Sequence, residues 1–155
     1  MLTIDQETDP ALICRLSRSV QEDHVRRRPD VFAPFSYEAL LPWFTELLTK
    51  AGVFCLVARV DDRPAGYLLC VHKRSDGNPF LQPGAQWIHI DQMSVEKDFQ
   101  GQGIGKALIA EVIRIARERD VARLTLNVWD DNERAVGFYE HLGLRPFRWD
   151  MELWL

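Results

Sequence analysis

The sequence has little cysteine and no long apolar run. Its three cysteines are odd in number and widely spaced, and two of them lie in apolar, strand-like runs. This pattern indicates buried free thiols in a reducing compartment, not a disulfide framework. No apolar stretch comes close to the length of about 18 residues that a membrane span needs, and no secretory leader pattern opens the sequence. We therefore expect a cytoplasmic protein without membrane contact.

The sequence also lacks an excess of positive charge and any low-complexity tract. A formal net charge of -4 argues against a nucleic-acid partner. The three arginines at positions 26–28 form a local basic cluster, which we interpret as a solvated patch. With 155 residues and 46% hydrophobic content the chain can bury a sizeable core. Residues 1–155 are therefore predicted to form a single domain.

Apolar periodicity, turn residues and helix caps predict alternating strands and helices. Strands are expected at residues 2–4, 53–60, 65–72, 86–95 and 123–128, with one or two closing strands between 145 and 155. Helices are expected at residues 10–24, 36–49, 104–119 and 132–142. The strand, helix and strand over 86–128 are long enough for a parallel crossover. The predicted class is therefore α/β (α+β), with a mixed, mostly antiparallel sheet flanked by helices on both faces.

A glycine-rich loop, Gln100-Gly101-Gln102-Gly103-Ile104-Gly105-Lys106, lies between a predicted strand and a long amphipathic helix. Its glycines let backbone amides crowd toward a ligand, and the helix start adds free N–H groups and a partial positive charge. The loop therefore predicts a phosphate or pyrophosphate site. A triphosphate loop is excluded because Ala107 stands where a magnesium-binding hydroxyl is needed, and the glycine spacing does not fit a dinucleotide fingerprint.

The remaining pattern is Gln-x-x-Gly-x-Gly, at Gln100, Gly103 and Gly105, followed downstream by Asn132, Ala135, Phe138, Tyr139 and Gly143. In this order the motifs resemble the GNAT superfamily of acyl-coenzyme A dependent N-acetyltransferases. The resemblance covers roughly the last 70 residues well and residues 1–85 in outline only. It implies the GNAT fold, with about six or seven strands, a parallel central pair and about four helices. It also implies acetyl-CoA as co-substrate and no metal ion.

The resemblance implies three sets of cofactor-binding residues. The loop residues would hold the pyrophosphate: Gln100, Gly101, Gln102, Gly103, Ile104, Gly105 and Lys106. The strand backbone at Met93, Ser94 and Val95 would bond the pantetheine amides, because the family splays this strand from the next one. Asn132, Ala135 and Tyr139 would flank the pantetheine arm. Gln100 departs from the arginine often found at its place in the family, and Lys106 is a candidate to compensate.

Direct acetyl transfer to an amine needs proton transfers. An alkylamine of pKa ~10.4 is about 99.9% protonated at pH 7, so freeing its lone pair costs roughly 4 to 5 kcal/mol. A base near the amine and an acid near the departing sulfur therefore help. Tyr139 stands two helical turns after Asn132, and in the resembled family the tyrosine at this place protonates the coenzyme A thiolate. From spacing alone, Tyr139 could instead pack a short helix and Asn132 could only cap it.

The base is predicted on the strand at residues 86–95. His89 and Asp91 alternate with Met93 and Val95, so all four are expected on one strand face. His89 has the more suitable unperturbed pKa, and Asp91 could orient it or bind the cationic amine. Either residue or a water-mediated route stays open, as does a structural role for the histidine.

The acceptor is expected to be a primary amine of a small molecule, bound by the first two helices and the 73–84 loop. Three alternatives stay open: a protein N-terminus, a lysine side chain, and a non-catalytic acyl-CoA sensor. A homodimer is also left open.

Overall fold

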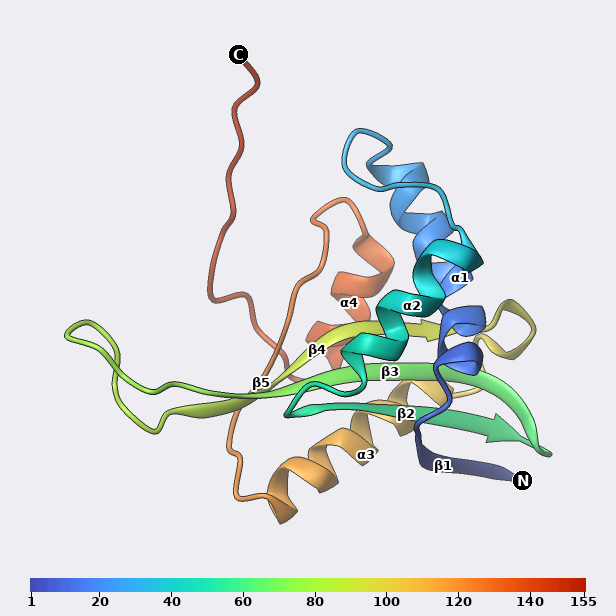
Figure 1. Cartoon of the computed structure of the whole chain (residues 1–155), viewed down its shortest axis with the longest axis horizontal. Helices are drawn as coiled ribbons and strands as arrows, with labels where there is room; N and C mark the ends of the chain where they lie inside the picture. Colours follow the sequence, from blue (N-terminus) through green and yellow to red (C-terminus); the bar gives the residue numbers. More distant parts are fainter.

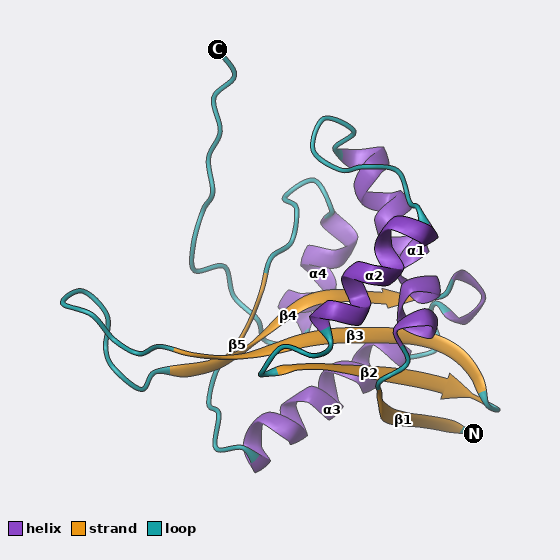
Figure 2. Cartoon of the chain, viewed as in Figure 1, coloured by secondary structure: helices purple, strands orange, loops and turns teal.

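The computed structural model describes residues 1–155 and shows a twisted five-stranded sheet with helices on both faces (Figure 1). The strands are β1 (Leu2–Glu7), β2 (Val53–Val60), β3 (Arg63–Arg74), β4 (Gln86–Val95) and β5 (Leu124–Leu126), in the sheet order β1-β2-β3-β4-β5. The helices are α1 (Pro10–Arg27), α2 (Tyr37–Leu47), α3 (Ile104–Glu118) and α4 (Glu133–His141). A short 3-10 turn at Lys97–Phe99 was not predicted. Figure 2 shows how these elements alternate with loops.

The helix starts follow the predicted caps. The Asp9 carboxylate accepts a hydrogen bond from the Ala11 amide at 2.9 Å, and Pro10 occupies the first helical position, where its missing N–H is not needed. Ser36 caps α2 in the same way, accepting from the Ala39 amide at 3.3 Å. Both predicted starts are confirmed.

The sheet separates two apolar cores. On one face, α1 and α2 bury a cluster that includes Ile13, Phe44 and Tyr67. On the other face, α3 packs through Ile104, Leu108 and Val112, and α4 adds side chains at one end of this second cluster. The amphipathic stripe predicted for residues 104–119 therefore faces the sheet.

Strand β4 is the only strand with one antiparallel and one parallel neighbour, which confirms the predicted mixed sheet. Its parallel ladder with β5 is short and pairs Ile88 with Leu124, His89 with Thr125, and Ile90 with Leu126. Beyond Ile90 the two strands part, because β5 ends while β4 continues to Val95.

A β-bulge in β4 overturns one expectation. Against β3, Ile90 pairs with Cys70 and Gln92 pairs with Leu69, so Asp91 is an extra residue without a partner. An inserted residue reverses the alternation of side chains along a strand. Met93 and Val95 therefore pack on the α3 face with Ile90, whereas His89 lies on the opposite face. The prediction that His89 shares a face with Met93 and Val95 is wrong.

The predicted closing strands between residues 145 and 155 are not formed, so the sheet has five strands and not six or seven. Residues 145–155 make no backbone hydrogen bond in the chain, and they run away from the sheet (Figure 1). Pro146 at the start of this segment has no N–H to donate to a ladder.

Candidate active site

The glycine loop forms an open cradle of backbone amides before α3. Gly101 and Gly103 have φ values of 77° and 80°, and nothing lies within 4 Å of the position a Cβ would take at either one. The first helical hydrogen bond comes from the Ala107 amide to the Gly103 carbonyl, so the amides of residues 101–106 have no acceptor within the chain. Six free donors at the positive end of a helix suit a pyrophosphate.

Gly105 serves a different purpose from the other two loop glycines. A Cβ at Gly105 would lie 3.2 Å from Cζ of Phe138 and 3.5 Å from Cε of Met93. The missing side chain therefore lets the start of α3 pack closely against both α4 and β4. This contact joins the cradle to the other two parts of the candidate site.

Two cations flank the cradle. Lys106 is exposed in the first turn of α3, where a positive side chain opposes the helix dipole unless an anion is bound. Arg134, in the first turn of α4, donates from Nη1 to Oε1 of Gln100 at 3.3 Å. Sequence reasoning missed Arg134, although its position two residues after Asn132 could have suggested it. Gln100 thus lacks a charge of its own but holds a guanidinium beside the loop.

The edge of β4 between Asp91 and Val95 has no strand partner on the side of β5. Its backbone at Met93, Ser94 and Val95 leads from the parallel ladder to the cradle. One group on this edge is already bonded, since Nε2 of Gln100 donates to the Val95 carbonyl at 3.1 Å. An extended amide chain can add to such an edge as an extra strand would.

Helix α4 carries Asn132 and Tyr139 and packs beside the start of α3 through Phe138. The side-chain oxygen of Asn132 caps the helix by accepting from the Ala135 amide at 3.2 Å, which leaves its NH₂ group for another partner. Tyr139 packs against the same apolar cluster as Met93, and its ring centroid lies 5.2 Å from that of Phe138. Burial raises the pKa of Tyr139 above its ordinary value, so the phenol is protonated at neutral pH.

His89 lies in the parallel ladder and is half-buried. Its Nδ1 shares a hydrogen bond of 2.8 Å with Oγ1 of the buried Thr125, its partner in β5. Burial lowers the pKa of His89, the cations of Lys73 and Arg148 lower it further, and Asp91 opposes them. The imidazole is therefore neutral at pH 7, and Nε2 has no partner within the chain. Asp91 is exposed at the bulge.

The predicted acceptor surface is corrected in one respect. The loop over residues 73–84 projects beyond the end of β3 and β4, away from α1 and α2, so it cannot line one pocket with them (Figure 1). The arginine cluster at positions 26–28, interpreted from the sequence as a solvated patch, forms ion pairs, and only Arg26 is largely exposed. Arg27 binds Asp23 at 2.9 Å and Asp131 at 3.4 Å, and Arg28 binds Asp30 at 2.7 Å.

An aromatic cluster instead joins the end of α1 to the loop between β5 and α4. His24 stacks on Phe32 with ring centroids 4.6 Å apart, and Phe32 meets the edge of Trp129 at 5.8 Å. The Arg28 guanidinium lies 5.2 Å from the Trp129 ring. This cluster thus links α1, the α1–α2 connection and the loop before α4.

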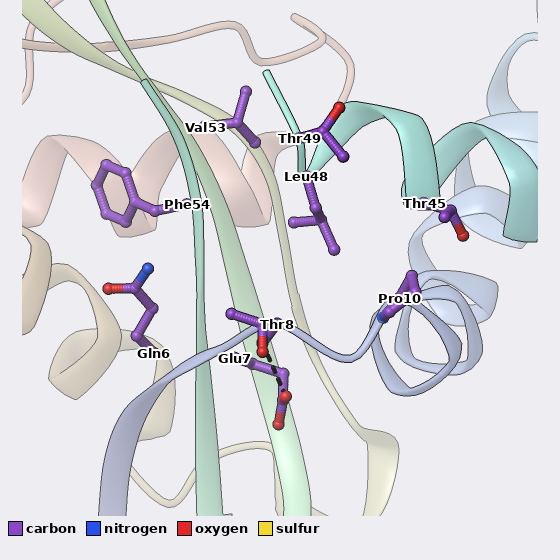
Figure 3. A pocket seen from close by; sticks show the side chains of 9 residues that line it. All are labelled: Gln6, Glu7, Thr8, Pro10, Thr45, Leu48, Thr49, Val53 and Phe54. Atoms are coloured by element: carbon purple, nitrogen blue, oxygen red, sulfur yellow. Dashed lines mark hydrogen bonds between the residues drawn. The ribbon is translucent and has the colours of Figure 1, made fainter. Parts of the chain in front are cut away.

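One hollow, of about 520 Å³, lies between α1 and the α1–α2 connection, where Arg18, Glu22 and Tyr37 are among its lining residues. A second, of about 270 Å³, is bounded by the ends of β1 and α2 and the start of β2, and Figure 3 shows its lining. Its single carboxylate, Glu7, is already engaged by the amides of Thr8 and Asp9 and by Arg59, so it offers no free charge. No group of three or more histidine, cysteine, aspartate or glutamate side chains converges as metal ligands would. Nor does any helix have the length and apolar character needed to span a membrane.

The mixed sheet, the unpaired β4 edge and the amide cradle before α3 define a GNAT-like architecture. Comparison with known sequences agrees, and the chain belongs to the acetyltransferase (GNAT) family, whose model matches residues 17–144. It is similar to a glucosamine 6-phosphate N-acetyltransferase from Trypanosoma brucei brucei, with 34% identity over 48% of each chain. It is also similar to the peptidyl-lysine N-acetyltransferase YjaB from Salmonella typhimurium, with 39% identity over 65% of this chain and 55% of that protein. The chain thus spans about half the length of these curated relatives.

Solved structures give the same fold along the whole chain. A mutant of the BH1408 protein from Bacillus halodurans superimposes with a TM-score of 0.89 and 26% identity, covering 99% of both chains. The aminoglycoside N-acetyltransferase AAC(6')-Iy in complex with CoA superimposes with a TM-score of 0.77 at 15% identity, a likeness of fold alone.

Proposed function

We propose that this protein transfers the acetyl group of acetyl-CoA to a primary amine, most simply that of a small molecule. The observation that carries the proposal is the continuity of two backbone features: the unpaired edge of β4 from Asp91 to Val95 leads to the six free amides of residues 101–106. Such a surface fits a long amide-containing arm that ends in a pyrophosphate. Lys106 and Arg134 would add positive charge beside that pyrophosphate.

In this proposal Tyr139 is the general acid. When acetyl-CoA is bound, it supplies the acyl group and a thiolate leaving group. Tyr139 belongs to the helix that packs against the open edge of β4 through Phe138 and Met93. Its burial keeps the hydroxyl protonated at neutral pH, so a proton is available for the sulfur as the thiolate leaves.

His89 is the better base of the two candidates. Its lowered pKa keeps it ready to accept a proton at pH 7, and the hydrogen bond to Thr125 fixes the ring. It lies on the face of β4 opposite Met93, toward α1 and α2, so the amine would approach from the side away from α3. Asp91, one residue beyond the parallel ladder, is suited to attract the ammonium form of the substrate.

The acceptor class is the least constrained part of the proposal. The relatives named above act, by their names, on an amino sugar phosphate and on peptidyl lysine. The aromatic cluster of His24, Phe32 and Trp129 offers an apolar surface that an amino sugar or a lysine side chain could contact on the acceptor side. A panel of amino sugars, polyamines and lysine peptides, assayed for acetyl transfer by mass spectrometry, would separate these classes. Tight CoA binding without transfer to any amine would favour a sensor over an enzyme.

The anion cradle can be tested with a matched pair of variants. Asparagine and aspartate both tolerate the left-handed conformation of Gly103 and both cap helices, so Gly103→Asn and Gly103→Asp should fold alike. Only the aspartate adds a negative charge beside the free amides. We expect Gly103→Asp to bind CoA roughly tenfold or more weakly than Gly103→Asn in calorimetry, a difference of about 1.4 kcal/mol. Equal affinities in the two variants would contradict the assignment of this loop.

A further inference from the structure

Gln92 lies beside His89 on the face of the sheet toward α1 and α2. The bulge at Asp91 makes them neighbours on that face. Their partners in β3 are two residues apart, Val71 for His89 and Leu69 for Gln92. Side chains at two such positions point to the same face and lie about 7 Å apart. The proton transfers leave the Gln92 side chain without a role, although it is next to the proposed base.

A buried tyrosine fixes the orientation of the Gln92 amide. The Tyr67 side chain is fully buried, and its hydroxyl donates to Oε1 of Gln92 at 2.8 Å. Burial raises the pKa of Tyr67 well above its ordinary value, so the proton stays on the phenol. The hydroxyl has no other hydrogen-bond partner in the chain, and the opposite orientation of the amide would leave the buried O–H without an acceptor. Gln92 therefore keeps its oxygen toward Tyr67.

The NH₂ group of Gln92 is consequently free. Nε2 makes no hydrogen bond in the chain, and the side chain is half-buried. The group is not sealed in the interior, because every fully buried polar side-chain atom has a partner. An amide NH₂ carries two donors and no acceptor, so it suits an oxygen atom of a ligand and not an ammonium group.

We propose that Gln92 determines acceptor specificity by donating from Nε2 to a substrate oxygen on the carbon next to the one that carries the amine. This role rests on the proposed acetyl transfer with His89 as the base. Hydrogen bonds of about 3 Å at His89 and at Gln92 leave only a few ångströms between the amine nitrogen and that oxygen. Vicinal amino alcohols and α-amino carbonyl compounds have this spacing. Simple alkylamines, polyamines and the lysine side chain lack the oxygen.

Three small amines test the specificity. Ethanolamine and propylamine differ by a hydroxyl in place of a methyl group, and glycinamide offers a carbonyl oxygen instead. We expect kcat/KM for at least one of the two oxygen-bearing amines to exceed that for propylamine roughly tenfold, the contribution of one net hydrogen bond. Comparing ethanolamine with glycinamide then separates hydroxyl from carbonyl acceptors. Rates are compared at equal concentrations of the free base, because the oxygen substituent lowers the pKa of the amine.

Three variants assign the preference to the amide. Gln92→Met keeps the length of the side chain without a donor and should abolish the preference. Tyr67→Phe frees the amide to turn without touching the substrate, and it should weaken the preference while the Kd for CoA stays the same. Gln86→Met is the matched control, because it makes the same change at a half-buried position at the other end of β4. It should keep the preference. Equal losses for all three amines in Gln92→Met would overturn the proposal and place the amide at the thioester oxygen.

NMR supplies a readout that needs no turnover. In isotope-labelled protein saturated with CoA, the side-chain NH₂ signals of Gln92 are identified by their absence in Gln92→Met. They should shift on addition of an oxygen-bearing amine and not of propylamine. If the protein acetylates none of the amines but the signals shift in this way, the proposed transfer fails and the assignment of Gln92 stands. Signals that stay in place, or that move equally with all three amines, would overturn the assignment.

Discussion

At the residue scale, burial sets the protonation of both groups proposed for proton transfer. It raises the pKa of the Tyr139 phenol and lowers the pKa of the His89 imidazole, because in each case the charged form loses its hydration. Both shifts favour the neutral forms, which are the forms that an acid at the sulfur and a base at the amine require. The chemistry therefore needs no unusual charge partner for either side chain.

Removal of the Tyr139 hydroxyl should affect the chemical step and not the binding of the cofactor. In Tyr139→Phe we expect kcat to fall by roughly 10²- to 10⁴-fold, the usual contribution of a general acid. The Kd for CoA should change little, because the ring and its packing remain. Steady-state kinetics with calorimetry on the same preparation would measure both. A variant with wild-type kcat would show that water or no acid serves the thiolate.

The pH profile distinguishes His89 from Asp91. If His89 is the base, the acidic limb of kcat/KM should lie below pH ~6.5, because its pKa is lowered from that ordinary value. Asp91 acts to raise the pKa of His89, so Asp91→Asn should move the limb to still lower pH while His89→Ala removes it. Loss of the limb in Asp91→Asn alone would instead make Asp91 the base. Amines of different pKa are needed as controls, because the substrate titrates too.

At the element scale, the position of α4 depends on glycine packing. Gly105 brings α3 close to Phe138, the neighbour of Tyr139. A Cβ at 3.2 Å from Phe138 would displace α4 by a few tenths of an ångström, and catalytic geometry is sensitive to such shifts. The bulge at Asp91 lies in β4 itself: Ile90 and Gln92 pair with consecutive residues of β3, so deleting Asp91 would give a regular pleat and leave Gln92 and Met93 on their present faces.

A pair of glycine substitutions tests this dependence. Gly105→Ala should lower kcat roughly tenfold, through the displacement of Tyr139, with little loss of stability, because improved helix propensity offsets the tight contact. Gly137→Ala is the matched control, because nothing lies within 4 Å of a Cβ there. It should keep kcat and gain about 0.5–1 kcal/mol in the free energy of unfolding. Thermal unfolding and kcat measured on both variants check the result, and equal kcat values would contradict it.

The elements show what the sequence could and could not predict. Local signals predicted the four α-helices and the five strands that form, because caps such as Asp9 and Ser36 and the apolar stripe of α3 involve residues close together in the sequence. The bulge at Asp91 has no such signal, since it exists only in the register of β4 against β3. For the same reason the predicted strand face of His89 was wrong. Its hydrogen-bond partner Thr125 was missed because it lies 36 residues away in the sequence.

At the scale of the whole molecule, two half-buried histidines couple stability to pH. The pKa of His24 and that of His89 are both lowered, chiefly by burial. Between the ordinary value of ~6.5 and the lowered native values, the unfolded chain therefore binds more protons than the folded one, so stability falls as pH falls through this window.

We accordingly expect a lower urea midpoint at pH 5.5 than at pH 7.5. The difference should shrink in a variant carrying His24→Gln and His89→Gln, whose side chains do not titrate. Unfolding followed by circular dichroism at the two pH values measures it. If the double variant kept the full difference, carboxylates such as Glu7 and Asp23, whose pKa values are also lowered, would be responsible instead.

The number of strands in the sheet is also a property of the whole molecule, and the prediction from the sequence was too high. Residues 147–155 have a strand pattern, and the prediction assigned them to the sheet of their own chain. Alternation of apolar and polar residues predicts a strand with one buried face, but it does not identify the residues that bury that face. The predicted closing strands over residues 145–155 are therefore absent from the sheet of this chain.

The three buried cysteines have a practical consequence. Burial raises the pKa of each thiol, that of Cys55 to about 12, so none is a reactive thiolate in the native state at neutral pH. A colorimetric thiol reagent should thus see only the CoA released by turnover, with no background from the folded enzyme. In denaturant the same reagent should titrate three thiols per chain. The core on the α1–α2 side contains Cys14 and Cys55, and the core on the α3 side contains Cys70. The rate at which these thiols react in the absence of substrate would therefore measure how fast each core opens.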